Sequence, residues 1–122
     1  MIKMTYCLRR LPHLSRKQFQ DYWLSSHGAL VRSHAQALNI RRYVQVHTAE
    51  HPVNDAMQKS RGATEPFDGI AEIWFDSVEA MTAPGATPQG KAAMRALRED
   101  ETRFIDQARS PVGFGEEHTV VG

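Results

Sequence analysis

Two histidines, His27 and His34, stand seven positions apart in the stretch DYWLSSHGALVRSHA, residues 21–35. Imidazole exchanges protons near neutral pH and also binds metal ions, so such a pair suggests acid–base chemistry or a metal site. On a helix of about 100° per residue, both lie on the same apolar face as Phe19 and Trp23, and they are predicted to point inward. Seven helical residues span about 10.5 Å along the axis. Because one ion binds its ligands at about 2.1 Å, the two rings cannot share it, and we predict no metal site.

Two carboxylates of a later segment provide partners for these rings. Glu101 lies inside the apolar face of the predicted helix 89–108, and Asp100 lies at the edge of that face. A carboxylate that faces a core must find a partner or stay protonated. Either histidine against Asp100 or Glu101 would form a buried pair that holds one imidazole tautomer and raises the basicity of the ring. We predict that His27 is a general acid/base oriented by Asp100 or Glu101, with His34 as its buried neighbour. A purely structural polar pair is the alternative.

Predicted strands add further polar and aromatic side chains. In residues 41–48, RRYVQVHT, the two valines face one way, and Tyr43, Gln45 and His47 face the other. If the valines pack on the helices, the second set lines a cavity on the opposite face of the sheet. The predicted substrate-binding residues are Trp23, Tyr43, His47, Asp68, Glu72 and Trp74. The alternative is a polar subunit interface without a ligand.

The elements that must position these residues alternate between strand and helix patterns. Ser15 and Gln18 have the spacing of a capping box at the start of the first helix. The expected elements are a strand at 2–10, a helix at 16–38, a strand at 41–48, a polar connection with a short helical turn at 49–65, a strand at 66–76, a short helix ending near 81, a helix at 89–108 and a strand within 112–121. The βαββαβ order predicts an α+β, ferredoxin-like fold with two helices on one face of a four-stranded antiparallel sheet.

The strand at 66–76 also predicts an assembly. Its alternate residues, from Phe67 to Phe75, are small or apolar and suit packing on helices. The other set combines Ile70 and Trp74 with two carboxylates, which suits a lined cavity more than open water. A second sheet from a second copy would cover that face. We therefore expect a homodimer that forms a dimeric α+β barrel.

Composition limits the remaining classes of function. The 122 residues are expected to form a single domain, residues 1–122, and a net charge of +1 favours neither nucleic acid nor an anionic membrane as partner. Cys7 is the only cysteine, so no intrachain disulfide is possible. No stretch approaches the roughly 18 apolar residues of a membrane span, and the N-terminus does not read as a signal peptide. A cytoplasmic location is expected.

The chain resembles the EthD family of the dimeric α+β barrel superfamily. The resemblance rests on SRKQFQDYWLSSHGALV at 15–31, RRYVQVHT at 41–48, FDGIAEIWFDS at 67–77 and LREDETRFID at 97–106, and above all on the YW-x3-H and FDG-x2-E elements. It implies a dimer with a pocket between helices and sheet in each subunit, and it implies that His27 is a functional position. Relatives in the superfamily include muconolactone isomerases, polyketide cyclases, dehydratases, quinol-forming monooxygenases and haem-degrading enzymes, so the resemblance leaves the reaction open.

Three functions follow from these observations. The leading expectation is a cofactor-independent acid–base enzyme, an isomerase, dehydratase or lyase, acting on a small cyclic, aromatic or lactone-like compound. The first alternative is an oxidoreductase, either a cofactor-free monooxygenase or a haem-linked enzyme with His27 or His47 as ligand. The second alternative is a non-catalytic dimer that binds a small molecule as an accessory component.

Overall fold

The computed structural model describes all 122 residues. Its elements are β1 (Ile2–Leu8), α1 (Arg16–Tyr22), a π-helical segment called here the π turn (Trp23–His27), α2 (Gly28–His34), β2 (Arg42–His47), α3 (Pro52–Arg61), β3 (Gly69–Phe75), α4 (Val78–Thr82), α5 (Pro88–Glu101) and β4 (Val112–Gly115). Short 3-10 helices occupy Ala83–Ala86 and Gln107–Arg109. The predicted order of strands and long helices is confirmed.

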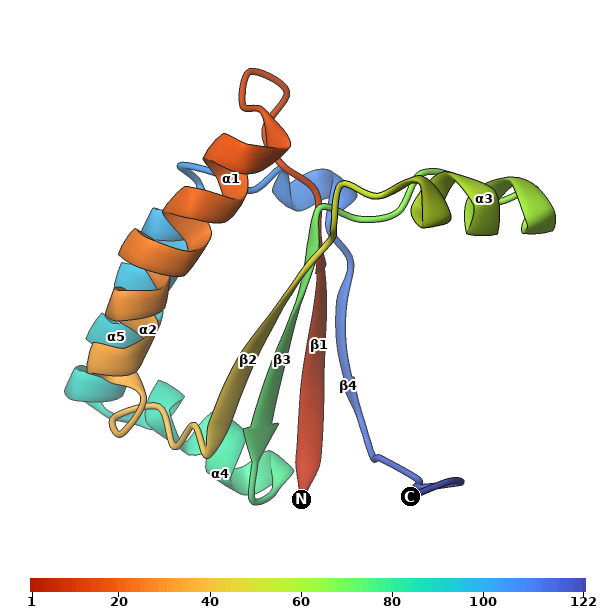
Figure 1. The fold of residues 1–122 in the computed structure, drawn as a ribbon. Coiled ribbons are helices and arrows are strands. Elements are labelled where there is room, and N and C mark those ends of the chain that lie inside the picture. Colours follow the sequence, from red (N-terminus) through yellow and green to blue (C-terminus); the bar gives the residue numbers. More distant parts are fainter.

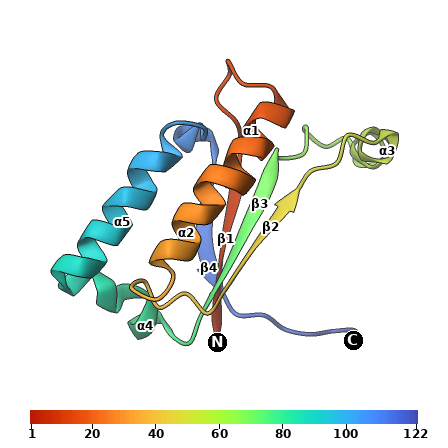
Figure 2. The ribbon, with the colours of Figure 1, turned by 60° about the vertical axis from the view of Figure 1, so that its left-hand side comes forward.

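The four strands form one antiparallel sheet in the order β2-β3-β1-β4. Helices α1, α2 and α5 lie together on one side of this sheet, and no helix is packed on the other face (Figure 1, Figure 2). The ferredoxin-like α+β fold is therefore confirmed. None of the helices combines the length and the apolar character that crossing a bilayer requires.

Local sequence signals explain where several helices begin and end. Ser15 caps α1 as predicted, because its hydroxyl accepts from the Gln18 amide and the Gln18 side chain accepts from the Ser15 amide. The connection after β2 holds a ten-residue helix, α3, where only a helical turn was predicted. His51 caps this helix, Pro52 begins it, and Gly62 ends it in the left-handed conformation at φ 59°.

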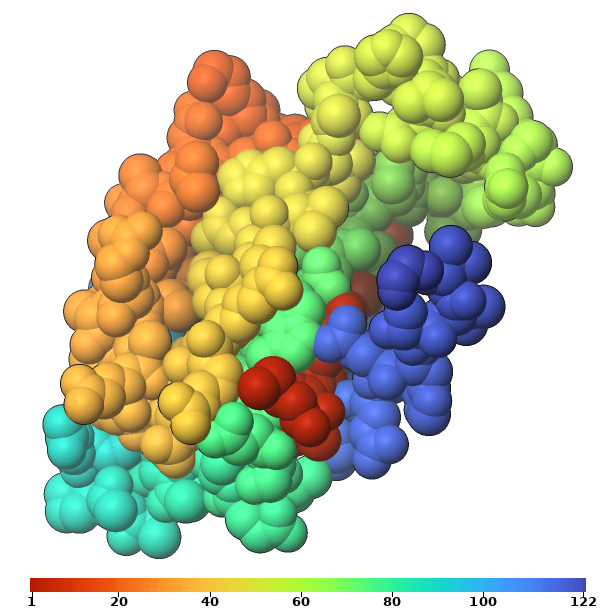
Figure 3. Space-filling view, turned by 60° about the horizontal axis from the view of Figure 1, so that its bottom comes forward, coloured from red at the N-terminus to blue at the C-terminus, as the bar shows by residue number.

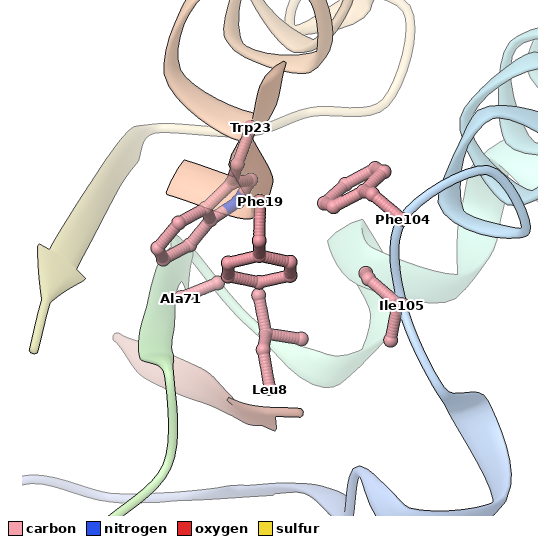
Figure 4. Close-up of a cluster of buried hydrophobic side chains, with 6 residues drawn as sticks. All are labelled: Leu8, Phe19, Trp23, Ala71, Phe104 and Ile105. Atoms are coloured by element: carbon pink, nitrogen blue, oxygen red, sulfur yellow. The ribbon is translucent and has the colours of Figure 1, made fainter. Parts of the chain in front are cut away.

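The main core joins α1, the π turn, the strands β1 and β3, and the segment after α5. It is made of Leu8, Phe19, Trp23, Ala71, Phe104 and Ile105, with the aromatic rings gathered between the helices and the sheet (Figure 4). Trp23 is 1% exposed, and its indole covers Gly69 at the start of β3. A Cβ atom on Gly69 would lie 2.3 Å from Trp23 Cζ3. The position therefore requires glycine so that the indole can lie against the strand.

Replacing Gly69 with alanine should destabilise the protein by about 1–3 kcal/mol, because the added methyl group forces the buried indole to move. Urea unfolding followed by tryptophan fluorescence measures the change. Gly113→Ala on β4 is the matched control, since a Cβ at Gly113 meets no atom within 4 Å. Equal stability of the two variants would contradict the close approach of Trp23 to β3.

Candidate active site

His27 and Asp100 meet between the π turn and α5. Asp100 Oδ2 lies 2.8 Å from His27 Nδ1, and both residues are 6% exposed. The other carboxylate oxygen accepts from the Tyr22 hydroxyl at 2.5 Å and from Arg103 Nη1 at 3.0 Å. The His27 ring also packs on Phe104, with ring centroids 5.0 Å apart. The structure thus brings two of the predicted residues together and adds Tyr22, which the sequence analysis named only within the YW-x3-H motif and not as a site residue.

The π turn explains how Tyr22 and His27 reach the same carboxylate. Five residues of α-helix turn through about 500°, which would place the two side chains about 140° apart. In a π-helix the backbone bonds run from residue i to i+5, so residues five apart lie nearly one above the other. The Gly28 amide makes such a bond to the Trp23 carbonyl. The extra residue in this turn therefore directs both side chains towards Asp100.

Burial and hydrogen bonding set the protonation of this pair. Burial lowers the pKa of His27, and the Asp100 hydrogen bond only partly opposes it. Burial alone would raise the pKa of Asp100, but hydrogen bonds from Tyr22 and His27, the His27 charge and Arg103 lower it overall. Near neutral pH the pair therefore consists of a neutral imidazole and a carboxylate. Because a carboxylate only accepts, the proton is on Nδ1 and the lone pair is on Nε2.

The Nε2 atom of His27 has no hydrogen-bond partner in the protein, since its only side-chain hydrogen bond is the one through Nδ1. No fully buried side-chain nitrogen or oxygen in the structure lacks a partner. It follows that Nε2 keeps some exposure despite the burial of the ring. A basic nitrogen that is held in one tautomer and open on one side is suited to exchanging a proton with a small molecule.

A second hydrogen-bond network, called here the β2 network, connects Trp23 with Tyr43, Gln45 and His47. The Tyr43 hydroxyl oxygen accepts from Trp23 Nε1 at 3.1 Å and from Gln45 Nε2 at 3.0 Å. Gln45 Nε2 also donates to the Trp23 carbonyl at 2.9 Å, and Gln45 Oε1 lies 2.8 Å from His47 Nε2. The His47 ring stacks on Trp23 at 4.7 Å. Because the Trp23 carbonyl is also an acceptor of the π turn, β2 holds that turn in place.

Glu101, the other predicted partner of the histidines, forms no hydrogen bond with His27. It lies near Tyr6 of β1, and burial together with the Glu101 charge raises the pKa of the Tyr6 hydroxyl to about 12. Burial also raises the pKa of Glu101 itself. His34, at the end of α2, is half-buried. Of the four histidine–carboxylate pairings that the sequence left open, the structure contains His27 with Asp100.

The predicted substrate-binding set does not share one cavity. Tyr43 accepts a hydrogen bond from Trp23 and the His47 ring stacks on Trp23, so both lie on the helix-covered face. Val46 pairs with Ile70 and lies on the free face. The expectation that the valines of β2 pack on the helices is therefore wrong. The alternation in β2 indicates which residues share a face, but both sets contain residues that tolerate burial, so the pattern does not identify the face.

Glu72 and Trp74 lie on the free face of the sheet. Lys3 Nζ is 2.5 Å from Glu72 Oε2 and 5.1 Å from the centre of the Trp74 ring. The Arg42 guanidinium lies 4.6 Å from the centre of the same ring, and Glu117 accepts a hydrogen bond from the Trp74 indole. Their neighbours are therefore charged side chains of β1, β2 and the C-terminal segment, and the sheet separates them from His27.

Asp68 lies in a third place, at the end of the sheet where β3 begins. It is 4% exposed, and its Oδ1 atom is 2.5 Å from Arg10 Nη1 and 3.0 Å from Arg16 Nε. Its Oδ2 atom accepts from the Arg10 amide at 2.8 Å. These bonds join the end of β1, the start of α1 and the start of β3. Asp68 therefore organises this end of the fold, and both of its oxygens are occupied by the protein.

A pocket of about 380 Å³ lies between α2 and β2. Its apolar walls include Leu24, Val31, Ala35 and Ile40, and Tyr43 and Gln45 of the β2 network also line it. Gly28, which follows His27 in the chain, borders it, whereas His27 itself does not. No group of three or more His, Cys, Asp or Glu side chains is arranged to hold a metal ion.

The β2 network makes a testable prediction about His27. Gln45→Ala removes the side-chain bond to the Trp23 carbonyl, so the π turn should loosen and the imidazole ¹⁵N signals of His27 should shift or broaden in NMR spectra. Val46→Ala, which shortens the neighbouring side chain on the free face, is the control and should leave those signals unchanged. Identical His27 signals in both variants would show that Gln45 does not hold the π turn.

Comparison with solved structures supports the fold. HapK from Hahella chejuensis is similar with a TM-score of 0.60 and 13% identity, over 100% of this chain and 96% of that one. A dimeric protein of unknown function and ferredoxin-like fold from Bacteroides fragilis has a TM-score of 0.59 and 10% identity, over 95% of each chain. SnoaB, a cofactor-independent oxygenase from Streptomyces nogalater, has a TM-score of 0.52 and 12% identity, over 98% of this chain and 95% of that one.

Comparison of the sequence with known proteins identifies one family. No curated protein matches the chain significantly. The model of the EthD domain matches residues 11–108, a range that begins just before α1, includes the π turn with His27, and ends beyond Asp100. The chain belongs to the EthD family.

Proposed function

We propose that this protein is an enzyme in which His27 removes a proton from a small cyclic, aromatic or lactone-like compound and returns it at another atom or to a leaving group. The reaction class is that of an isomerase, dehydratase or lyase that needs no cofactor. The observation that carries the proposal is a buried imidazole whose Nδ1 is bound to Asp100 while Nε2 has no protein partner.

The surroundings of His27 suit both halves of a proton transfer. Before the reaction, burial keeps the pKa of His27 below its ordinary value, so the ring is neutral and can accept a proton. After the transfer, the Asp100 carboxylate stabilises the imidazolium through the 2.8 Å contact. Tyr22 and Arg103 keep that carboxylate charged and oriented. A correctly placed acid–base group is worth about 10²–10⁴ in rate.

His27→Ala should keep the fold and lower turnover at least about a hundredfold, because the proton acceptor is lost. A panel of lactones and phenolic compounds, followed by NMR for turnover, identifies the substrate and measures the loss. His27→Gln, which retains a donor for Asp100, should show the same loss, and circular dichroism verifies folding. The control is His34→Ala, which should retain activity. Unchanged turnover in both His27 variants would refute the assignment.

A second candidate is a cofactor-free oxygenase. It is supported by the likeness to SnoaB, which is a cofactor-independent oxygenase. The same proton removal by His27 would produce the electron-rich form of a quinol-like substrate that can react with oxygen. Oxygen uptake during turnover distinguishes this candidate from an isomerase or lyase, while tight binding without any turnover would indicate a non-catalytic binding protein.

We also propose that the protein works as a homodimer, with two copies packed through the free face of the sheet. This face exposes Val46 by 45%. Helix α3 supports the same assembly, because it stands out from the body as a separate lobe (Figure 3) and none of its residues is buried. Its Val53 and Met57 are 49% and 48% exposed, and a lone helix of this length is marginal in water. A second copy would cover both surfaces.

Native mass spectrometry should detect a species of twice the 13.8 kDa chain mass. Val46→Glu should convert it to monomer, since a charge would be buried between the two sheets. Met94→Glu on α5 alters a residue of similar exposure, 43%, on the helical side and should leave the dimer intact. A monomeric parent protein would overturn this assembly.

A further inference from the structure

The geometry of the pocket between α2 and β2 points to a ligand class: we propose that it binds a small ring compound carrying a carboxylate. The inference deepens the proposed function and rests on its premise that the protein acts on a small cyclic molecule. What it adds is the charge of that molecule and the residues that recognise it, and these are Tyr43 and Arg32.

The hydrogen bonds around Tyr43, which lines the pocket, leave one donor unused. The Tyr43 oxygen accepts two bonds, from Trp23 Nε1 and Gln45 Nε2, and its own proton has no acceptor in the protein. The Gln45 amide nitrogen already donates twice, to Tyr43 and to the Trp23 carbonyl. Because the two donors to Tyr43 polarise its O–H group, the hydroxyl is a strengthened donor. A ligand that reaches this hydroxyl is therefore expected to supply an acceptor.

The titration of Tyr43 agrees with that role. Burial raises the pKa of its hydroxyl above the ordinary value, although the bonds from Gln45 and Trp23 oppose the change. Tyr43 consequently keeps its proton throughout the physiological pH range. Its hydroxyl can therefore donate to a carboxylate or carbonyl oxygen, and it does not become a phenolate that would repel such a ligand.

The pocket lining contains arginines but no acidic residue, and only Arg32 keeps its guanidinium free of other partners. The three arginines are Arg32, Arg41 and Arg42. Arg41 is bound to Asp76 through Nε and Nη2, and Arg42 lies over the Trp74 ring. Arg32 forms no ion pair or side-chain hydrogen bond in the structure, so its planar guanidinium is available for a two-point contact with a carboxylate.

The walls determine the rest of the ligand. Leu24, Val31, Ala35 and Ile40 present aliphatic surface to the pocket. A volume of about 380 Å³ is at the small end of ligand sites, which run from roughly 300 to 1,000 Å³. It suits one or two fused rings. Inorganic anions would satisfy Arg32 but leave the apolar walls in water, so an aromatic or alicyclic acid fits better than a free phosphate.

The test uses 2-naphthoate as the probe and 2-naphthalenemethanol as its neutral counterpart, each titrated into ¹⁵N-labelled protein. The expected result is that 2-naphthoate shifts the amide signals of Gly28 and Gln45 and binds at least about tenfold more tightly than the alcohol. Arg32→Gln and Tyr43→Phe should each weaken 2-naphthoate about tenfold, and Arg32→Gln should not affect the alcohol. The exposed Arg61→Gln on α3 is the charge-matched control and should bind as the parent does.

Equal affinity for acid and alcohol, no effect of Arg32→Gln, or the absence of shifts at Gly28 and Gln45 would each overturn the proposal. Arg32 is exposed, so Arg32→Gln is not expected to disturb folding. If Tyr43→Phe does not fold, the affinity of Arg32→Gln for 2-naphthoate tests the proposal by itself. Because His27 does not line the pocket, 2-naphthoate binding tests the pocket without testing the acid–base role of His27. The two proposals can therefore be refuted separately. Failure to bind 2-naphthoate would refute the pocket assignment but not the acid–base role of His27, and absence of turnover would refute that role but not the pocket assignment.

Discussion

The hydrogen bond between His27 Nδ1 and Asp100 Oδ2 is the interaction on which the site depends. It joins the π turn to α5 at a place where both side chains are nearly excluded from water. A buried carboxylate is costly unless its oxygens are satisfied, and Asp100 meets that requirement with donors from Tyr22, His27 and Arg103. The same bonds that stabilise the carboxylate fix the imidazole in the tautomer that leaves Nε2 basic.

Several features of the fold serve this one contact. The π turn places Tyr22 and His27 on a common side of the helix, and Gln45 reaches from β2 to the carbonyl of Trp23 in that turn. Trp23 in turn requires Gly69 at the start of β3, because no side chain fits beneath its indole. Gln45 of β2, the π turn and Gly69 of β3 are distant in sequence, and together they set the direction of the His27 ring.

The features that could be predicted from the sequence are those that depend on local residue patterns. Strand and helix order, the Ser15 cap, the two faces of β3 and the inward direction of His27 all follow from periodicity and capping. The π turn was missed because helical periodicity assumes an unbroken 3.6-residue repeat, and only the contacts with Asp100 and Gln45 account for the extra residue. The face of β2 and the ion cluster of Asp68 with Arg10 and Arg16 were also missed, since both depend on pairing between distant segments.

The central claim is that His27 is a neutral, oriented base at physiological pH. The most direct test is an NMR titration of its imidazole ¹⁵N nuclei in the intact protein. The account predicts a neutral ring with the proton on Nδ1, and a pKa below the ordinary value of about 6.5. A ring protonated on Nε2, or a pKa above 6.5, would contradict it, because the free nitrogen would then carry a proton when the substrate arrives.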